Sequence, residues 1–195
     1  MSARLHAVAA PTSFRRVAQG LPVGPVVEAL KANPGLWGEH GMRKATYAHG
    51  GMEDIWVRYN APENQGPAFN DQHWPVWYPA AAKLPLAPIW QRLMTVCGGE
   101  MLGGILITKV PPGGEIRPHV DASWHAGYYS KFYVALQNGM GSVFGWDDGN
   151  IHARDGEAYW FRNDRPHWVF NGSSKDRLSM IVCIRTEKEG FRVEG

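Results

Sequence analysis

The second half of this 195-residue chain alternates between short strand-like segments and turn signals. Asp148-Gly149 and Asp155-Gly156 are dipeptides that favour tight hairpin turns. Eight short strands at such regular spacing favour a β-sandwich or a jelly roll. We therefore predict a mainly β protein with flanking helices and a double-stranded β-helix, or jelly roll, at its centre. The eight strand-like segments are 102–110, 115–120, 131–137, 142–146, 150–153, 157–161, 167–171 and 177–186.

The first hundred residues predict fewer elements. Apolar residues recur at helical spacing in 23–35 and 86–98, and both segments end in glycine. Residues 53–60 alternate as a strand, and 61–75 has the composition of a loop. The sequence shows no repeat and no clear linker. We expect a single domain, 1–195, in which residues 1–100 are an extension that packs on a jelly-roll core at 101–186.

Charge and composition argue against several partners. The net charge is +2, from 20 basic and 18 acidic residues, so nothing predicts a nucleic-acid-binding or membrane-binding surface. The apolar stretch 5–10 is too short for a signal peptide and contains His6. Cys97 and Cys183 lie in apolar stretches, which predicts buried free thiols in a reducing compartment. We expect a cytoplasmic protein.

A histidine and an aspartate stand two residues apart in "RPHVDASWH". Alternate residues of a strand point to the same side, so His119 and Asp121 can reach one point in space. His167 opens the seventh predicted strand, and the second and seventh strands of a jelly roll are antiparallel neighbours. Two imidazoles and one carboxylate are the ligand set of non-haem Fe(II) oxygenases. The sequence predicts a metal site at His119, Asp121 and His167, which Zn, Mn or Co could also occupy.

Arg177 follows His167 by ten residues and begins the last strand. If the metal binds a 2-oxo acid, the distal carboxylate of that acid needs a partner. A guanidinium supplies a permanent charge and a fork of donors. The alternative is an ordinary ion pair between Arg177 and Asp176 or Glu157.

The chain resembles the Fe(II)- and 2-oxoglutarate-dependent oxygenases, and most closely the aspartyl/asparaginyl β-hydroxylase family. The resemblance rests on "TKVPPGGEIRPHVD", "KFYVALQN" and "HWVFNGSSKDRLSMIV" and covers residues 102–185. It implies that His119, Asp121 and His167 hold Fe(II), and that Arg177 binds the distal carboxylate of 2-oxoglutarate.

The same resemblance implies an activity and three further cosubstrate contacts. Thr108 stands where the family places a hydroxyl residue that helps to hold the cosubstrate, and Lys131 where some members use an arginine for this purpose. Tyr133 would face inward beside Lys131. The implied enzyme is a dioxygenase that uses Fe(II), 2-oxoglutarate and O2 to hydroxylate an unactivated C–H bond, releasing succinate and CO2. Its substrate would be an amino-acid residue of a peptide or protein, or a free amino acid.

The loop 122–130 departs from the family pattern, so the substrate is open at this point. Trp124, His125 and Tyr128 are the residues of this loop that we expect to contact substrate. Arg58, on the strand 53–60, could meet a substrate carboxylate. His125 is expected to be a substrate contact and not a metal ligand, because its spacing of six residues from His119 fits a helix turn poorly.

Three other functions remain open from the sequence. A metal-binding cupin without 2-oxoglutarate chemistry would not need Arg177. A nucleic-acid base oxygenase predicts a basic groove and base stacking on Trp124 or Tyr128. A non-catalytic binding domain on the same scaffold would not need the complete set of ligands.

Overall fold

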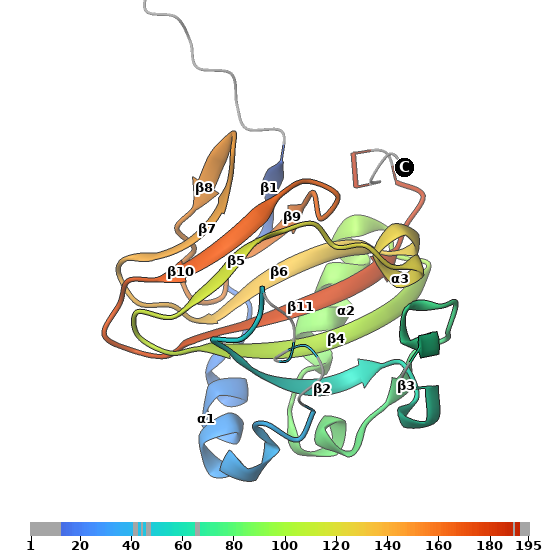
Figure 1. The fold of residues 1–195 in the computed structure, drawn as a ribbon, viewed down its shortest axis with the longest axis horizontal. Coiled ribbons are helices and arrows are strands. Elements are labelled where there is room, and N and C mark those ends of the chain that lie inside the picture. The colour runs from blue at the N-terminus through green and yellow to red at the C-terminus, as the bar shows by residue number, and fades with distance from the viewer. Residues whose placement is uncertain are drawn as a thin grey trace, which may run out of the picture.

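The chain forms two antiparallel sheets that face one another (Figure 1). The computed structural model describes residues 13–40, 43, 45, 48–64, 67–188 and 190–191. The larger sheet has the order β1-β9-β6-β11-β4-β2-β3 and the smaller sheet the order β5-β10-β7-β8. The strands are β1 (Phe14–Ala18), β2 (Glu53–Tyr59), β3 (Val76–Trp77), β4 (Met101–Val110), β5 (Glu115–His119), β6 (Ser130–Gln137), β7 (Ser142–Trp146), β8 (Gly149–Ile151), β9 (Ala158–Phe161), β10 (His167–Asn171) and β11 (Arg177–Arg185). The α-helices are α1 (Gly24–Ala32), α2 (Ala87–Cys97) and α3 (Trp124–Tyr128), and the short 3-10 helices are η1 (Pro34–Leu36), η2 (Pro62–Asn64), η3 (Pro67–Asn70) and η4 (Pro79–Lys83).

The eight predicted strands are confirmed as β4 to β11, and they form a jelly roll. β5 and β10, the second and seventh of the series, pair antiparallel with His119 opposite His167. β7 and β8 form the hairpin predicted at Asp148-Gly149, but the turn lies one residue earlier, at Asp147-Asp148, because Gly149 already pairs with Trp146. The hairpin predicted at Asp155-Gly156 is wrong, because β8 and β9 belong to different sheets. Gly156, at φ +80°, instead lies in a turn that carries the chain from one sheet to the other.

Strand alternation divides the larger sheet into a helix-facing side and a cavity-facing side. On β11, Met180 and Val182 belong to the core under the helices, whereas Ile181 and Cys183 line a cavity between the sheets. β6 has the same two sides, because Phe132 joins the core under the helices whereas its neighbours Lys131 and Tyr133 line the cavity. The period of two is what allows one strand to serve both a dry core and a functional cavity.

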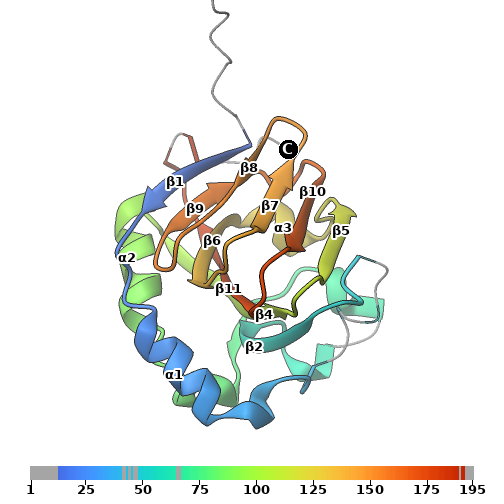
Figure 2. The same ribbon diagram turned by 90° about the vertical axis from the view of Figure 1, so that its left-hand side faces the viewer.

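The two predicted longer helices, α1 and α2, cover the outer side of the larger sheet (Figure 2). Val26 and Leu30 of α1, and Ile89 and Leu93 of α2, are buried in one cluster with the sheet. α2 ends at Gly98, whose left-handed conformation at φ +61° is one that glycine adopts without a steric penalty.

Replacing Leu93 by alanine should destabilise the protein by about 2–5 kcal/mol, the range for truncating a fully buried leucine. Leu93 is 0% exposed and packs under the sheet. Urea unfolding measures the loss, and Arg92→Ala on the exposed side of the same helix is the control. A change below about 1 kcal/mol would contradict this packing, because surface substitutions lie in that range.

The first hundred residues also contribute strands. β2 pairs with β4, and β3 adds a two-residue edge strand. β1 was not predicted, and it extends the opposite edge by pairing with β9. The predicted loop 61–75 contains η2 and η3, and the helix α3 inside the loop 122–130 was not predicted.

Two remaining expectations concern the thiols and the N-terminus. Cys97 and Cys183 are buried and free, as predicted. Residues 5–10 lie outside the described part of the chain. Among the described residues, no helix has the length and apolar character needed to cross a lipid bilayer.

Candidate active site

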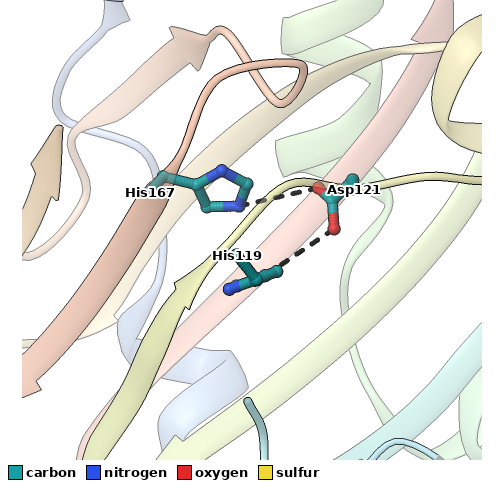
Figure 3. Close-up of side chains that lie close together, drawn as sticks. All are labelled: His119, Asp121 and His167. Carbon is teal, nitrogen blue, oxygen red and sulfur yellow. Dashed lines mark ion pairs between the residues drawn. The ribbon is translucent and has the colours of Figure 1, made fainter. Parts of the chain in front are cut away.

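Three side chains converge at one point (Figure 3), two from the neighbouring strands β5 and β10 and one from the segment that follows β5. His119 ends β5, Asp121 follows two residues later, and His167 begins β10. Asp121 Oδ1 lies 3.7 Å from His119 Nε2, and Asp121 Oδ2 lies 3.6 Å from His167 Nε2. One ligand atom from each residue lies within 4.8 Å of the others. The cross-strand pairing of His119 with His167 creates this cluster, because it places the two imidazoles side by side.

Both imidazoles are oriented by a hydrogen bond to the backbone carbonyl oxygen two residues earlier in the chain. His119 Nδ1 lies 2.8 Å from the carbonyl oxygen of Arg117, and His167 Nδ1 lies 2.8 Å from that of Arg165. A carbonyl oxygen can only accept a hydrogen bond, so each Nδ1 is the donor and a neutral ring keeps its lone pair on Nε2. Burial lowers the pKa of His167 to about 4, which keeps that ring neutral near pH 7. A metal ligand needs this tautomer and this charge state.

Asp121 is fixed through both its backbone and its side chain. Its backbone N–H donates to the Asn163 carbonyl oxygen at 3.0 Å. Lys131 Nζ donates to Asp121 Oδ2 at 2.6 Å. Burial acts to raise the pKa of Asp121, but the Lys131 ammonium and the two imidazoles outweigh it and hold that pKa below its usual range. The site therefore presents an ionised carboxylate beside the neutral imidazole of His167.

The cluster opens into a cavity of about 520 Å³ between the two sheets. This volume lies within the range of small-molecule binding sites. The smaller sheet contributes apolar side chains to the wall, and the larger sheet contributes most of the polar ones. The described lining residues outside the metal cluster that bear on function are His49, Tyr59, Thr108, His125, Lys131, Tyr133, Phe144, Phe161, Val169, Arg177, Ser179, Ile181 and Cys183.

Arg177 brings a buried positive charge to the wall of this cavity. Its side chain is among the largest fully buried ones, and the residue is 2% exposed. Nη1 donates to Ser179 Oγ at 3.1 Å, the guanidinium lies 5.0 Å from the Tyr133 ring centroid, and Nε has no hydrogen-bond partner. Within the described part of the chain no carboxylate pairs with it, and Glu157 pairs with Arg16 instead. A buried cation with donors unused is expected to bind an anionic ligand.

The other three residues predicted to hold a cosubstrate all line the cavity but have different partners. Thr108 Oγ1 donates to Asp54 Oδ1 at 2.8 Å. Tyr133 lies beside the Arg177 guanidinium, and its hydroxyl accepts a hydrogen bond from Asn138 at 3.0 Å. Lys131 donates a hydrogen bond to Asp121, one of the three candidate metal ligands.

The residues predicted to contact substrate divide into two groups around α3. His125 is 1% exposed, lines the cavity and accepts a hydrogen bond from the Gly104 backbone N–H at 3.2 Å. Trp124 and Tyr128 stack on one another at 4.8 Å outside the cavity lining. The position of His125 is set by α3, whose first turn is capped by Ser123 Oγ accepting from the Ala126 N–H.

Arg58 lies outside the cavity lining, whereas its neighbour Tyr59 is part of it. A register irregularity between Trp56 and Arg58 interrupts the alternation of β2. As a result Arg58 donates to the Gly103 carbonyl oxygen at 2.9 Å and lies 5.3 Å from the Trp77 ring. Strand alternation alone could not reveal this shift.

His49 was missed by the sequence analysis. It is buried, lines the cavity, and its ring meets the His119 ring edge-on at 4.6 Å. Burial, with Arg43 nearby, lowers the pKa of His49 to about 3. No local signal marks this residue, because its segment, "AHGG", belongs to no regular element. The helix α3 did have a signal, since Ser123 is a favoured N-cap residue.

The donor set fits a divalent transition-metal ion. It offers two imidazole Nε2 atoms and one ionised carboxylate on one side, and a cavity on the other. Such a face leaves further coordination positions for exogenous ligands, as in non-haem Fe(II) sites. The Nδ1–H bonds to backbone carbonyls are the outer contacts that metal-binding histidines ordinarily make.

The metal-free protein should lose stability as the pH falls from about 6.5 toward about 4, the window between the unfolded and folded histidine pKa values. Burial lowers the pKa of His49 to about 3 and that of His167 to about 4, and it also lowers the pKa of His125. The unfolded chain therefore binds more protons than the folded one in this window, which lowers the free energy of unfolding. Urea unfolding in EDTA at several pH values measures the slope. His125→Gln should flatten it and His152→Gln, at an exposed position, should not. A stability independent of pH across this window would contradict the buried neutral state.

Comparisons with known proteins support the fold. No family model matches the sequence, and no curated protein matches it. Among solved structures, a 2OG-Fe(II) oxygenase family oxidoreductase from Burkholderia pseudomallei is similar with a TM-score of 0.57 at 10% identity, over 94% of this chain and 89% of that one. A prolyl hydroxylase from Trichoplax adhaerens, solved with a hypoxia inducible factor peptide fragment, gives 0.57 at 12% identity, over 92% and 86%. A Pseudomonas putida prolyl-4-hydroxylase gives 0.51 at 19%, over 90% and 93%. The chain therefore has the jelly-roll fold of these 2-oxoglutarate oxygenases.

Proposed function

We propose that this protein is an Fe(II)- and 2-oxoglutarate-dependent oxygenase. The observation that carries the proposal is that one cavity contains both a candidate metal site and a buried guanidinium. A cluster of His119, Asp121 and His167 suits a divalent metal, and the buried guanidinium of Arg177 has no carboxylate partner in the described chain. A 2-oxo acid with a second carboxylate is a ligand that could bind the metal at one end and the Arg177 guanidinium at the other. When bound, Fe(II) with 2-oxoglutarate and O2 supplies the oxidising power to convert a C–H bond into C–OH, with release of succinate and CO2.

The protein's own residues bind, orient and exclude water. His119, Asp121 and His167 would hold the metal, and Arg177 would bind the distal carboxylate beside Tyr133 and Ser179. The rings of Phe144, Trp146 and Phe161 surround His167, with centroids at 5.9, 6.0 and 5.6 Å. This apolar cage fixes one imidazole and keeps water from that side of the reaction.

The substrate that we propose is an amino-acid side chain of a peptide or protein, or a free amino acid. The three solved structures of similar fold described above include two prolyl hydroxylases, one of them with a peptide. The resemblance of residues 108–121 and 167–182 to the aspartyl/asparaginyl β-hydroxylase family favours the same class of substrate. His125 and Tyr59, on the cavity wall away from Arg177, are the residues that we propose for substrate contact.

The test is conversion of 2-oxoglutarate to succinate by the protein with Fe(II) and O2, with and without panels of free amino acids and peptides. We expect substrate-stimulated succinate formation that is lost in His119→Ala. Failure to bind 2-oxoglutarate in the presence of metal would exclude the proposal. Metal binding without 2-oxoglutarate binding would instead favour a metal-binding cupin of another class.

A further inference from the structure

The cavity contains a second cation, the partly buried Lys131, whose side-chain partner is the candidate metal ligand Asp121. Lys131 Nζ lies 2.6 Å from Asp121 Oδ2, and the two side chains are 15% and 19% exposed. This is a short, charge-assisted hydrogen bond in a largely buried setting. Its contact differs from the one that the sequence resemblance implies for Lys131, which is cosubstrate binding.

The strand register separates Lys131 from the anion-binding end of the cavity. Lys131 on β6 stands opposite Cys183 on β11. Arg177 begins β11 six residues earlier, which is about 20 Å along an extended strand. Tyr133 lies between them on the cavity side of β6 and contacts the Arg177 guanidinium. Lys131 therefore belongs to the metal end of the cavity and not to the Arg177 end.

The two carboxylate oxygens of Asp121 differ in their surroundings. Oδ2 accepts the hydrogen bond from Lys131 and lies 3.6 Å from His167 Nε2, whereas Oδ1 lies 3.7 Å from His119 Nε2. The backbone of Asp121 is already held by the Asn163 carbonyl oxygen, so the side-chain rotation is what remains to be fixed. A carboxylate can bind a metal through one oxygen or through both. A donor held on one oxygen favours binding through the other.

We propose that Lys131 is a positioning residue for the metal ligand Asp121. It holds Oδ2 so that Asp121 offers one oxygen, Oδ1, to a divalent metal. The coordination position that a second carboxylate oxygen would fill then stays open for exogenous ligands. This inference rests on the proposed function, because it requires that His119, Asp121 and His167 bind a metal.

The test compares Lys131→Met, which removes the donor at similar length, with Lys131→Arg, which keeps both charge and donors. Mn(II) affinity is measured by titration calorimetry without 2-oxoglutarate, and the number of water molecules on bound Mn(II) by water-proton relaxation. We expect about 10- to 100-fold weaker Mn(II) binding and fewer metal-bound waters in Lys131→Met, the range for losing a partner of a metal ligand. Lys131→Arg should recover both values.

The outcomes separate this inference from the proposed function. Equal or tighter Mn(II) binding with an unchanged water number in Lys131→Met would overturn the positioning role. Intact Mn(II) binding with weakened 2-oxoglutarate binding at saturating Mn(II) would also overturn it and make Lys131 a cosubstrate ligand. A wild-type protein that binds no Mn(II), or binds it equally well after His119→Ala, would overturn the proposed function as well. Near-ultraviolet circular dichroism of each variant verifies that it is folded, and Lys131→Gln replaces any variant that is not.

Discussion

Replacing His167 by alanine is expected to abolish divalent-metal binding and all oxygenase activity. In the proposed site His167 is one of three metal ligands, and its Nε2 lies 3.6 Å from Asp121 Oδ2. Losing a ligand should weaken binding by more than the roughly 100-fold that loss of an outer partner can cost. Titration calorimetry with Mn(II) measures the affinity, and succinate formation with Fe(II) measures the activity.

The matched control is His152→Ala, because His152 is exposed and lies outside the cavity lining. It should bind Mn(II) as the wild type does. The His167 variant leaves a space among Phe144, Trp146 and Phe161, so its fold must be verified by near-ultraviolet circular dichroism. A folded His167→Ala protein with unchanged Mn(II) affinity would show that the metal ligands are assigned wrongly.

Replacing Arg177 by methionine is expected to weaken 2-oxoglutarate binding by about 30-fold or more while leaving Mn(II) affinity intact. Truncating one partner of a buried charge pair costs about 2–5 kcal/mol, and about 1.4 kcal/mol is a factor of ten. Arg177 does not contact the three candidate metal ligands, so its loss should weaken the affinity for 2-oxoglutarate and not the affinity for Mn(II). Calorimetric titration of 2-oxoglutarate into Mn(II)-saturated protein measures the loss.

We also expect Arg177→Met to differ from the wild type in how its thermal stability responds to 2-oxoglutarate. Without cosubstrate, Arg177 is a buried charge with no carboxylate partner in the described chain, so its removal should not lower the midpoint of thermal unfolding. Added 2-oxoglutarate should raise that midpoint in the wild type and not in Arg177→Met. Arg92→Met, at an exposed position of α2, is the control and should retain the shift. An equal shift in wild type and Arg177→Met would place the cosubstrate elsewhere.

The jelly roll was predictable from the sequence because its signals are local. Each strand has a period of two and is bounded by turn residues, and the topology follows from their number and order. The convergence of His119 with His167 followed from that topology, since the second and seventh strands pair. The error at Asp155-Gly156 has the same origin, because a turn dipeptide does not reveal which sheet the next strand joins.

The rest of the site depends on features that one sequence does not display. Because of the register irregularity in β2, Tyr59 lines the cavity where strand alternation would have placed Arg58. The contact of His49 with His119 joins residues far apart in the chain through a segment without regular structure. The partner of Lys131 is decided by strand register, which places it at the metal cluster and away from Arg177. Side-chain partners of this kind are tertiary facts, whereas periodicity reports only which face a residue occupies.

The most direct measurement is an anaerobic crystal structure with Mn(II) and a non-reacting 2-oxoglutarate analogue. We predict one metal ion bound by Nε2 of His119, Nε2 of His167 and Oδ1 of Asp121, with the distal carboxylate of the analogue on the Arg177 guanidinium. A metal ion bound elsewhere, or an analogue whose distal carboxylate does not contact Arg177, would contradict the proposed function.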